Sequence, residues 1–136
     1  MKIIIDTNVL MSGIFWSGPP AKILQAWQNR QIDFVLSPDI LQEYLRVSDV
    51  LAQKYPGVDV DDIIEILVKR SKIYDIKSLS TPVSRDPNDD MFIACAIATK
   101  VKIIVSGDLD LLQVNGYQSI KIVKPKQFVD NYLTPR

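Results

Sequence analysis

Histidine is absent from this 136-residue sequence, and its absence removes several kinds of active site at once. A Ser-His-Asp triad, a Cys-His pair and a zinc site with histidine ligands all require an imidazole ring. If the protein is an enzyme whose side chains act as metal ligands or bases, the leading candidates are therefore the carboxylates of aspartate and glutamate.

Cysteine is nearly absent as well, because the chain contains only Cys95. One cysteine cannot form a disulfide within the chain, which fits a reducing compartment. Long hydrophobic runs are lacking too: no stretch reaches the roughly 20 apolar residues that cross a bilayer. Asp6 and Asn8 interrupt the apolar N-terminus where a signal peptide would continue. We therefore expect a cytoplasmic protein with no membrane partner.

The sequence also lacks an excess of one charge, since 16 basic residues balance 16 acidic ones. Bulk positive charge therefore does not make this protein a general binder of polyanions, and contact with nucleic acid needs a local basic patch or a metal ion. Its length suits a single domain over residues 1–136, and 47% hydrophobic residues are ordinary for a globular protein.

Apolar runs typical of buried strands alternate with helical patterns along the chain. The predicted strands are Lys2–Ile5, Phe34–Leu36, Lys72–Ile76, Lys102–Val105 and Ile120–Val123. The predicted helices are Val9–Phe15, Ala21–Asn29, Ser37–Gln53, Asp59–Arg70, Pro87–Thr99, Leu109–Leu112 and Pro125–Tyr132, with a loop at Leu79–Arg85. This alternation predicts an α/β fold, a three-layer α/β/α sandwich with a mainly parallel sheet of about five strands.

Acidic residues follow the predicted strands at the edge where parallel sheets form their sites. Asp6 ends the first strand, Glu43 lies in the helix after the second, and Asp108 follows the fourth. Asp90 shares the apolar face of its predicted helix with Ile93, so we expect it to point toward the sheet. Clustered carboxylates repel one another, and Mg²⁺ or Mn²⁺ with oxygen ligands would resolve that repulsion.

Each acid also has a purely structural interpretation. Asp6 or Asn8 is a suitable N-cap for the first helix. Asp86 is a natural N-cap before Pro87, with Asp89 where a capping-box acid would stand. Taken singly, most acidic residues are simply exposed, so only their convergence favours a metal site.

Four segments together resemble the PIN-domain family, which includes the ribonucleases of toxin–antitoxin pairs. They are Ile5–Leu10, Glu43, Asp90–Ala96 and Val105–Leu111. The resemblance implies a nuclease that uses one or two Mg²⁺ or Mn²⁺ ions to cleave RNA. It implies that the catalytic and metal-binding acids are Asp6, Glu43, Asp90 and Asp108, with Asn8 and Ser106 as supports. Asp108 is the first choice for the fourth acid and Asp110 the second.

The resemblance further implies partners. The Arg85-Asp86-Pro87 lead-in resembles the toxin branch of the family, and this predicts an antitoxin protein as a partner. Apolar residues near Trp16 and Tyr44 help to predict a homodimer. Trp16 with Phe15 would stack on a nucleobase or, as aromatic residues more often do, pack in a core or an interface.

Two other function classes compete with the ribonuclease. One is a non-catalytic PIN-fold protein-interaction module, which a missing acid would favour, yet all four positions are acidic. The other is a phosphatase-like α/β enzyme. It would need a second acid two residues after Asp6, where this chain has Asn8.

Overall fold

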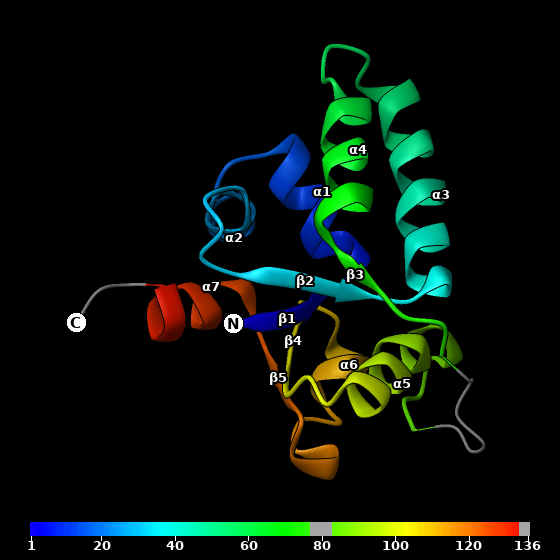
Figure 1. The fold of residues 1–136 in the computed structure, drawn as a ribbon, viewed down its shortest axis with the longest axis vertical. Coiled ribbons are helices and arrows are strands. Elements are labelled where there is room, and N and C mark those ends of the chain that lie inside the picture. The colour runs from blue at the N-terminus through cyan, green and yellow to red at the C-terminus, as the bar shows by residue number, and fades with distance from the viewer. Residues whose placement is uncertain (77–82, 134–136) are drawn as a thin grey trace.

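The computed structural model describes residues 1–76 and 83–133 (Figure 1). Its strands are β1 (Lys2–Ile5), β2 (Asp33–Leu36), β3 (Lys72–Ile73), β4 (Ile103–Val105) and β5 (Lys121–Val123). They form a five-stranded sheet in the order β3-β2-β1-β4-β5, and every neighbouring pair is parallel. The predicted parallel sheet is therefore confirmed.

Helices cover both faces of this sheet. They are α1 (Thr7–Phe15), α2 (Pro19–Gln28), α3 (Pro38–Lys54), α4 (Val60–Arg70), α5 (Asp90–Thr99), α6 (Leu109–Leu112) and α7 (Pro125–Phe128). Short 3-10 turns span Pro87–Asp89 and Tyr117–Ser119, and a π-helical segment spans Val129–Leu133. Figure 1 shows α1 to α4 on one side of the sheet and α5 and α6 on the other, which confirms the three-layer α/β/α sandwich.

The central strand β1 explains the isoleucine run at the start of the chain. It pairs with β2 on one side and β4 on the other, so its side chains are buried on both faces. Directly after it, the Asp6 backbone N–H donates to the Val105 carbonyl at 2.9 Å. Asp6 therefore sits beside the end of β4, at the carboxyl edge of the sheet.

Local signals set the helix starts, as the sequence predicts. The Ser37 hydroxyl accepts a hydrogen bond from the Ile40 backbone N–H at 3.3 Å, and Pro38 takes the first position of α3. Asp59 caps α4 in the same way through the Asp62 N–H. In Figure 1, α3 and α4 stand side by side as a helical pair above the sheet.

Several predicted boundaries need correction. β3 ends at Ile73 rather than Ile76, and most of the predicted loop Leu79–Arg85 lies outside the described residues. The helix predicted from Pro87 begins instead as a 3-10 turn, and α5 starts only at Asp90. Tyr44 is not on the surface: it is 1% exposed, and its hydroxyl donates to the Ile5 carbonyl at 2.5 Å.

The last features of the fold are a buried cysteine and the character of the helices. Cys95 is fully buried, and burial raises the pKa of its thiol to about 12, so this cysteine is not a nucleophile at neutral pH. Within the described parts of the chain, no helix combines the length and hydrophobicity needed to cross a bilayer.

Candidate metal centre

A cavity of about 160 Å³ opens at the carboxyl edge of the sheet. Four separate segments line it: the start of α1, the second turn of α3, the turn before α5 together with the first turn of α5, and the loop before α6. Its lining residues are Asp6, Thr7, Asn8, Glu43, Asp86, Asn88, Asp89, Met91, Phe92 and Asp108. The carboxyl edge predicted from the strand pattern is thus where the acids gather.

Asp6 lies at the floor of this cavity and is only 6% exposed. Its carboxylate accepts a hydrogen bond from the Ser106 hydroxyl at 2.7 Å. Burial is the main cause that raises its pKa, the Ser106 hydrogen bond opposes that shift, and the charge of Asp108 adds to it. Asp6 precedes α1, but its side chain makes no capping hydrogen bond, so the N-cap interpretation does not account for it.

Ser106, predicted as a support, links two acids. Its side chain is completely buried and donates to Asp6, while its oxygen accepts the Asp108 backbone N–H at 3.0 Å. The serine therefore fixes the Asp6 carboxylate and the start of the Asp108 loop relative to each other.

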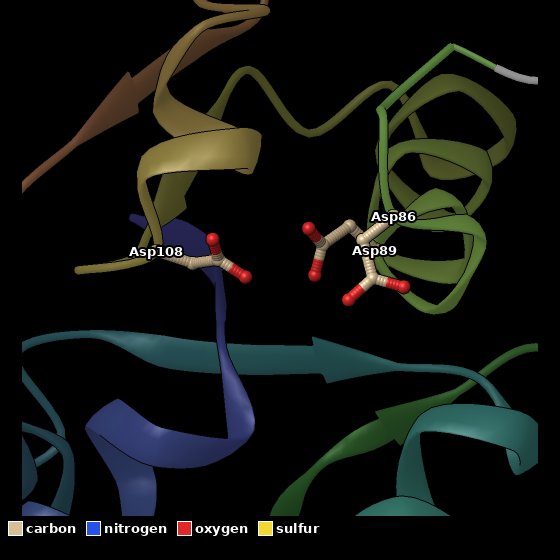
Figure 2. Close-up of side chains that lie close together, drawn as sticks. All are labelled: Asp86, Asp89 and Asp108. Carbon is tan, nitrogen blue, oxygen red and sulfur yellow. The ribbon is translucent and has the colours of Figure 1, made fainter.

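Asp89 is the acid that sequence reasoning assigned only to capping. It is 5% exposed, and the Ser84 hydroxyl donates to its carboxylate at 3.4 Å. One carboxylate oxygen from each of Asp86, Asp89 and Asp108 lies within 4.8 Å of the other two. Figure 2 shows the Asp108 carboxylate pointing across the gap toward the other two. Burial, followed by the charges of Asp108 and Asp6, raises the pKa of Asp89 to about 7.

Asp90, by contrast, does not line the cavity. Its carboxylate accepts backbone N–H groups of Val83, at 3.2 and 3.3 Å, and Ser84, at 2.8 Å. Because Asp90 is the first residue of α5, its side chain leans back toward the incoming loop rather than onto the sheet. The Asp90 carboxylate thus has a hydrogen-bond partner, but that partner is the backbone of the preceding loop and not another group of the cavity. The structure therefore places Asp89 where the sequence predicted Asp90.

The two candidates for the fourth acid are also separated. Asp108 lines the cavity, and its Oδ1 accepts the Asp110 backbone N–H at 2.9 Å, which caps α6. The Asp110 carboxylate is not a lining group and lies 4.0 Å from the Arg85 Nε. The geometry thus favours Asp108, the first choice.

Glu43 and Asn8 stand at the mouth of the cavity. Glu43 contacts Arg46 on the same helix through two hydrogen bonds of 2.7 and 3.1 Å. Asn8 is exposed and lines the cavity from the first turn of α1. Glu43 therefore lines the cavity and at the same time forms an ion pair with Arg46.

Asp86, Asp89 and Thr7 are lining residues that sequence reasoning did not place in the site. Asp86 does cap the 3-10 turn through the Asn88 N–H at 3.0 Å, which explains why its pattern looked purely structural. The Thr7 hydroxyl is buried without a hydrogen-bond partner among the described residues. The sequence pattern predicted an α-helix from Pro87, and Asp89 was missed because a 3-10 turn forms there instead.

The donor set fits a divalent cation. All the charged side chains that line the cavity are carboxylates, whose oxygen atoms suit Mg²⁺ or Mn²⁺. No lysine or arginine is among the described residues that line it. Buried carboxylates without a counter-charge are costly, as the raised pKa values of Asp6 and Asp89 show. A bound cation would remove this cost.

Comparison with known proteins agrees with this geometry. No curated protein matches the sequence. A family model described as PIN domain matches residues 2–110, a range that contains every acid lining the cavity. Proteins of this family are generally metal-dependent nucleases. Since the match covers most of the chain, and the sheet and acidic cavity accord with it, the chain belongs to the PIN-domain family.

Proposed function

We propose that this protein is a metal-dependent endoribonuclease that hydrolyses phosphodiester bonds of RNA with Mg²⁺ or Mn²⁺. One observation carries the proposal: acids from four segments converge on one cavity that has no basic lining residue within the described structure. Membership of the PIN-domain family supports a nuclease.

The metal ligands in this proposal are Asp6, Asp89 and Asp108, with Asp86 beside them and Glu43 at the mouth. A bound divalent ion would stabilise charge on the scissile phosphate and make a coordinated water a stronger nucleophile. Asp90 leaves the proposed set because its carboxylate is held by backbone amides.

The remaining polar groups position these acids. Ser106 holds one Asp6 oxygen in a fixed position by its hydrogen bond. Glu43 lies at the solvent side of the cavity, where a carboxylate can bind a metal through water or take a proton from the attacking water.

Cleavage of single-stranded RNA by the purified protein tests the proposal. We expect cleavage with Mg²⁺ or Mn²⁺, none with EDTA, and recovery when excess metal is restored. The same sequence made as DNA measures the preference for RNA. Equal cleavage with and without chelator contradicts the metal mechanism. Absence of cleavage under every metal condition favours the non-catalytic PIN-fold interaction module instead.

We further propose that the enzyme is the toxin of a toxin–antitoxin pair and acts in the cytoplasm. The family resemblance and the single buried cysteine support this proposal. Induced expression should arrest growth, while expression of the Asp6→Asn variant should not. A neighbouring gene for a short basic or DNA-binding protein whose product relieves the arrest would identify the antitoxin.

We also propose a homodimer, now on the basis of exposed apolar residues of α3 and α4. Tyr44 is buried and offers no interface, but Val50 on α3 and Ile66 and Val68 on α4 are exposed apolar residues. Light scattering over a wide concentration range tests the dimer, and a constant monomer mass rejects it.

A further inference from the structure

A second cavity adjoins the acidic one and leads away from it. Its volume is about 310 Å³, and it shares Asn8 and Asp108 with the acidic cavity. The other lining residues are Val9, Ser12, Pro20, Gly107 and Pro125. A strand of substrate that leaves the acids on this side would enter a channel whose floor is the solvent-facing side of α1.

An exposed tryptophan, Trp16, directly follows the last residue of α1. Trp16 is the C-cap residue of α1: its backbone is extended (φ −133°, ψ 170°), but its N–H still donates to the Ser12 carbonyl at 3.0 Å. Trp16 therefore lies about one turn beyond Ser12 along the axis of α1. Eight residues of helix span about 12 Å, roughly the length of three or four stacked nucleotides at about 3.4 Å each. In Figure 1, α1 lies between α2 and the α3–α4 pair.

Trp16 is held by other aromatic rings rather than left loose. It lies 5.9 Å from the Phe15 ring and 5.7 Å from the Tyr55 ring, the latter at 83°. The rings of Trp16 and Tyr55 meet edge to face, and Trp16 remains 50% exposed. The arrangement resembles a stacking platform for a planar ligand.

One lysine lies beside the aromatic cluster and another precedes a residue of the second cavity, although the acidic cavity has no basic residue among its described lining residues. Lys54 lies 5.7 Å from the centre of the Tyr55 ring, beside the aromatic cluster. Lys124 is exposed immediately before Pro125, which lines the second cavity. Aromatic rings combined with flanking cations are the usual means of binding single-stranded nucleic acid.

We propose that Trp16 forms a nucleobase-stacking subsite for a single-stranded RNA whose scissile phosphate lies in the acidic cavity. The inference rests on the proposed ribonuclease function and extends it by naming where the substrate strand runs. Stacking accepts every base, so the subsite selects unpaired strands of sufficient length rather than a sequence.

Intrinsic fluorescence tests the subsite without any cleavage, because the chain has two tryptophans of opposite exposure. Trp27 is 1% exposed, so quenching by RNA reports on Trp16, which is half exposed. Titration in EDTA with oligouridylates of increasing length should show quenching that strengthens between two and about five nucleotides. Quenching that is absent, or independent of length, overturns the inference.

Variants give the matching affinity test, with binding measured by anisotropy of a labelled RNA. Trp16→Ala should raise the Kd about 5- to 100-fold, while Trp16→Phe stays within about threefold. The matched control is Tyr74→Ala, an aromatic of 41% exposure that follows β3, an outermost strand of the sheet. Its Kd should not change. Equal Kd values for wild type and Trp16→Ala overturn the inference.

Two further outcomes distinguish the stacking subsite from a dimer interface and from the proposed nuclease function. If Trp16→Ala lowers the mass found by light scattering and leaves the Kd for RNA unchanged, Trp16 belongs to an interface between copies, and the subsite is refuted. If quenching depends on Trp16 but no metal supports cleavage, the subsite stands as an RNA-binding site and the proposed nuclease function fails.

Discussion

Two groups of three aspartates occur in this protein, and they behave differently. The α4 cluster consists of Asp59, Asp61 and Asp62. The cavity cluster consists of Asp86, Asp89 and Asp108. The α4 cluster is exposed at the first turn of a helix, where the dipole favours negative charge and Asp59 caps the backbone. The cavity cluster brings Asp108, from the loop before α6, close to Asp86 and Asp89 of the turn before α5, and it buries Asp89.

The causes of their pKa shifts show what separates the two groups. The pKa of Asp62 is raised first by a hydrogen bond and then by the charge of its neighbour Asp59, while water still solvates both groups. The pKa of Asp89 is raised to about 7, and burial is the largest cause. Close acids alone therefore do not mark a site; acids that have lost water without gaining a counter-charge do.

The largest expected effect comes from Asp6→Asn. The amide keeps an acceptor oxygen for the Ser106 hydroxyl but loses the charge that a metal requires. We expect cleavage to fall by about 100-fold or more, a size typical of losing one central electrostatic group. The metal-free melting temperature should be unchanged or higher, because a buried charge is removed.

Thermal melting with and without Mn²⁺, beside the cleavage assay, checks this prediction. The rise in melting temperature that Mn²⁺ gives the wild type should shrink in the variant, because stabilisation follows affinity. A full Mn²⁺ shift with normal cleavage would show that Asp6 is not a ligand.

Asp89→Asn and Asp90→Asn form a matched pair of adjacent substitutions. Asp89→Asn should lower both cleavage and the Mn²⁺ shift, though by less than Asp6→Asn does. Asp90→Asn should retain both but weaken the hydrogen bonds to Val83 and Ser84, lowering the free energy of unfolding by about 1–3 kcal/mol. Urea unfolding and the cleavage assay measure the two effects. Loss of the Mn²⁺ shift in Asp90→Asn alone would restore the assignment made from the sequence.

This pair also shows how far the sequence alone leads. The alternation of strands and helices predicts the sheet, and the position after β1 or β4 predicts Asp6 and Asp108, because a strand end has few alternative locations. Asp89 escapes prediction because the backbone of Pro87–Asp89 winds as a 3-10 turn, which rotates the neighbouring side chains away from their α-helical directions. Such a change depends on contacts with loop residues that no periodicity records.

A smaller effect is expected from pH on the metal-free protein. Asp89 binds its proton more tightly when folded, with a pKa of about 7, than when unfolded, near about 3.9. The folded state therefore holds more protons between these values, and stability should fall as pH rises from about 4 to about 7. Melting curves at pH 5 and pH 8 in EDTA check the sign.

Asp89→Asn should flatten this pH dependence, and saturating Mn²⁺ should reverse it, since a metal competes with the proton. Melting temperatures that rise with pH in metal-free wild type, with the same rise in Asp89→Asn, would contradict a buried proton on this residue.

The smallest effect is expected at the exposed group, from Asp62→Asn. The substitution relieves repulsion from Asp59 while leaving the Asp62 backbone N–H that Asp59 accepts. Since water already screens these charges, the melting temperature should rise by only about one or two degrees. Cleavage and the Mn²⁺ shift should equal those of the wild type. A Mn²⁺ shift that falls in Asp62→Asn as far as in Asp89→Asn would mean that proximity of acids, rather than their burial, determines where this protein binds metal.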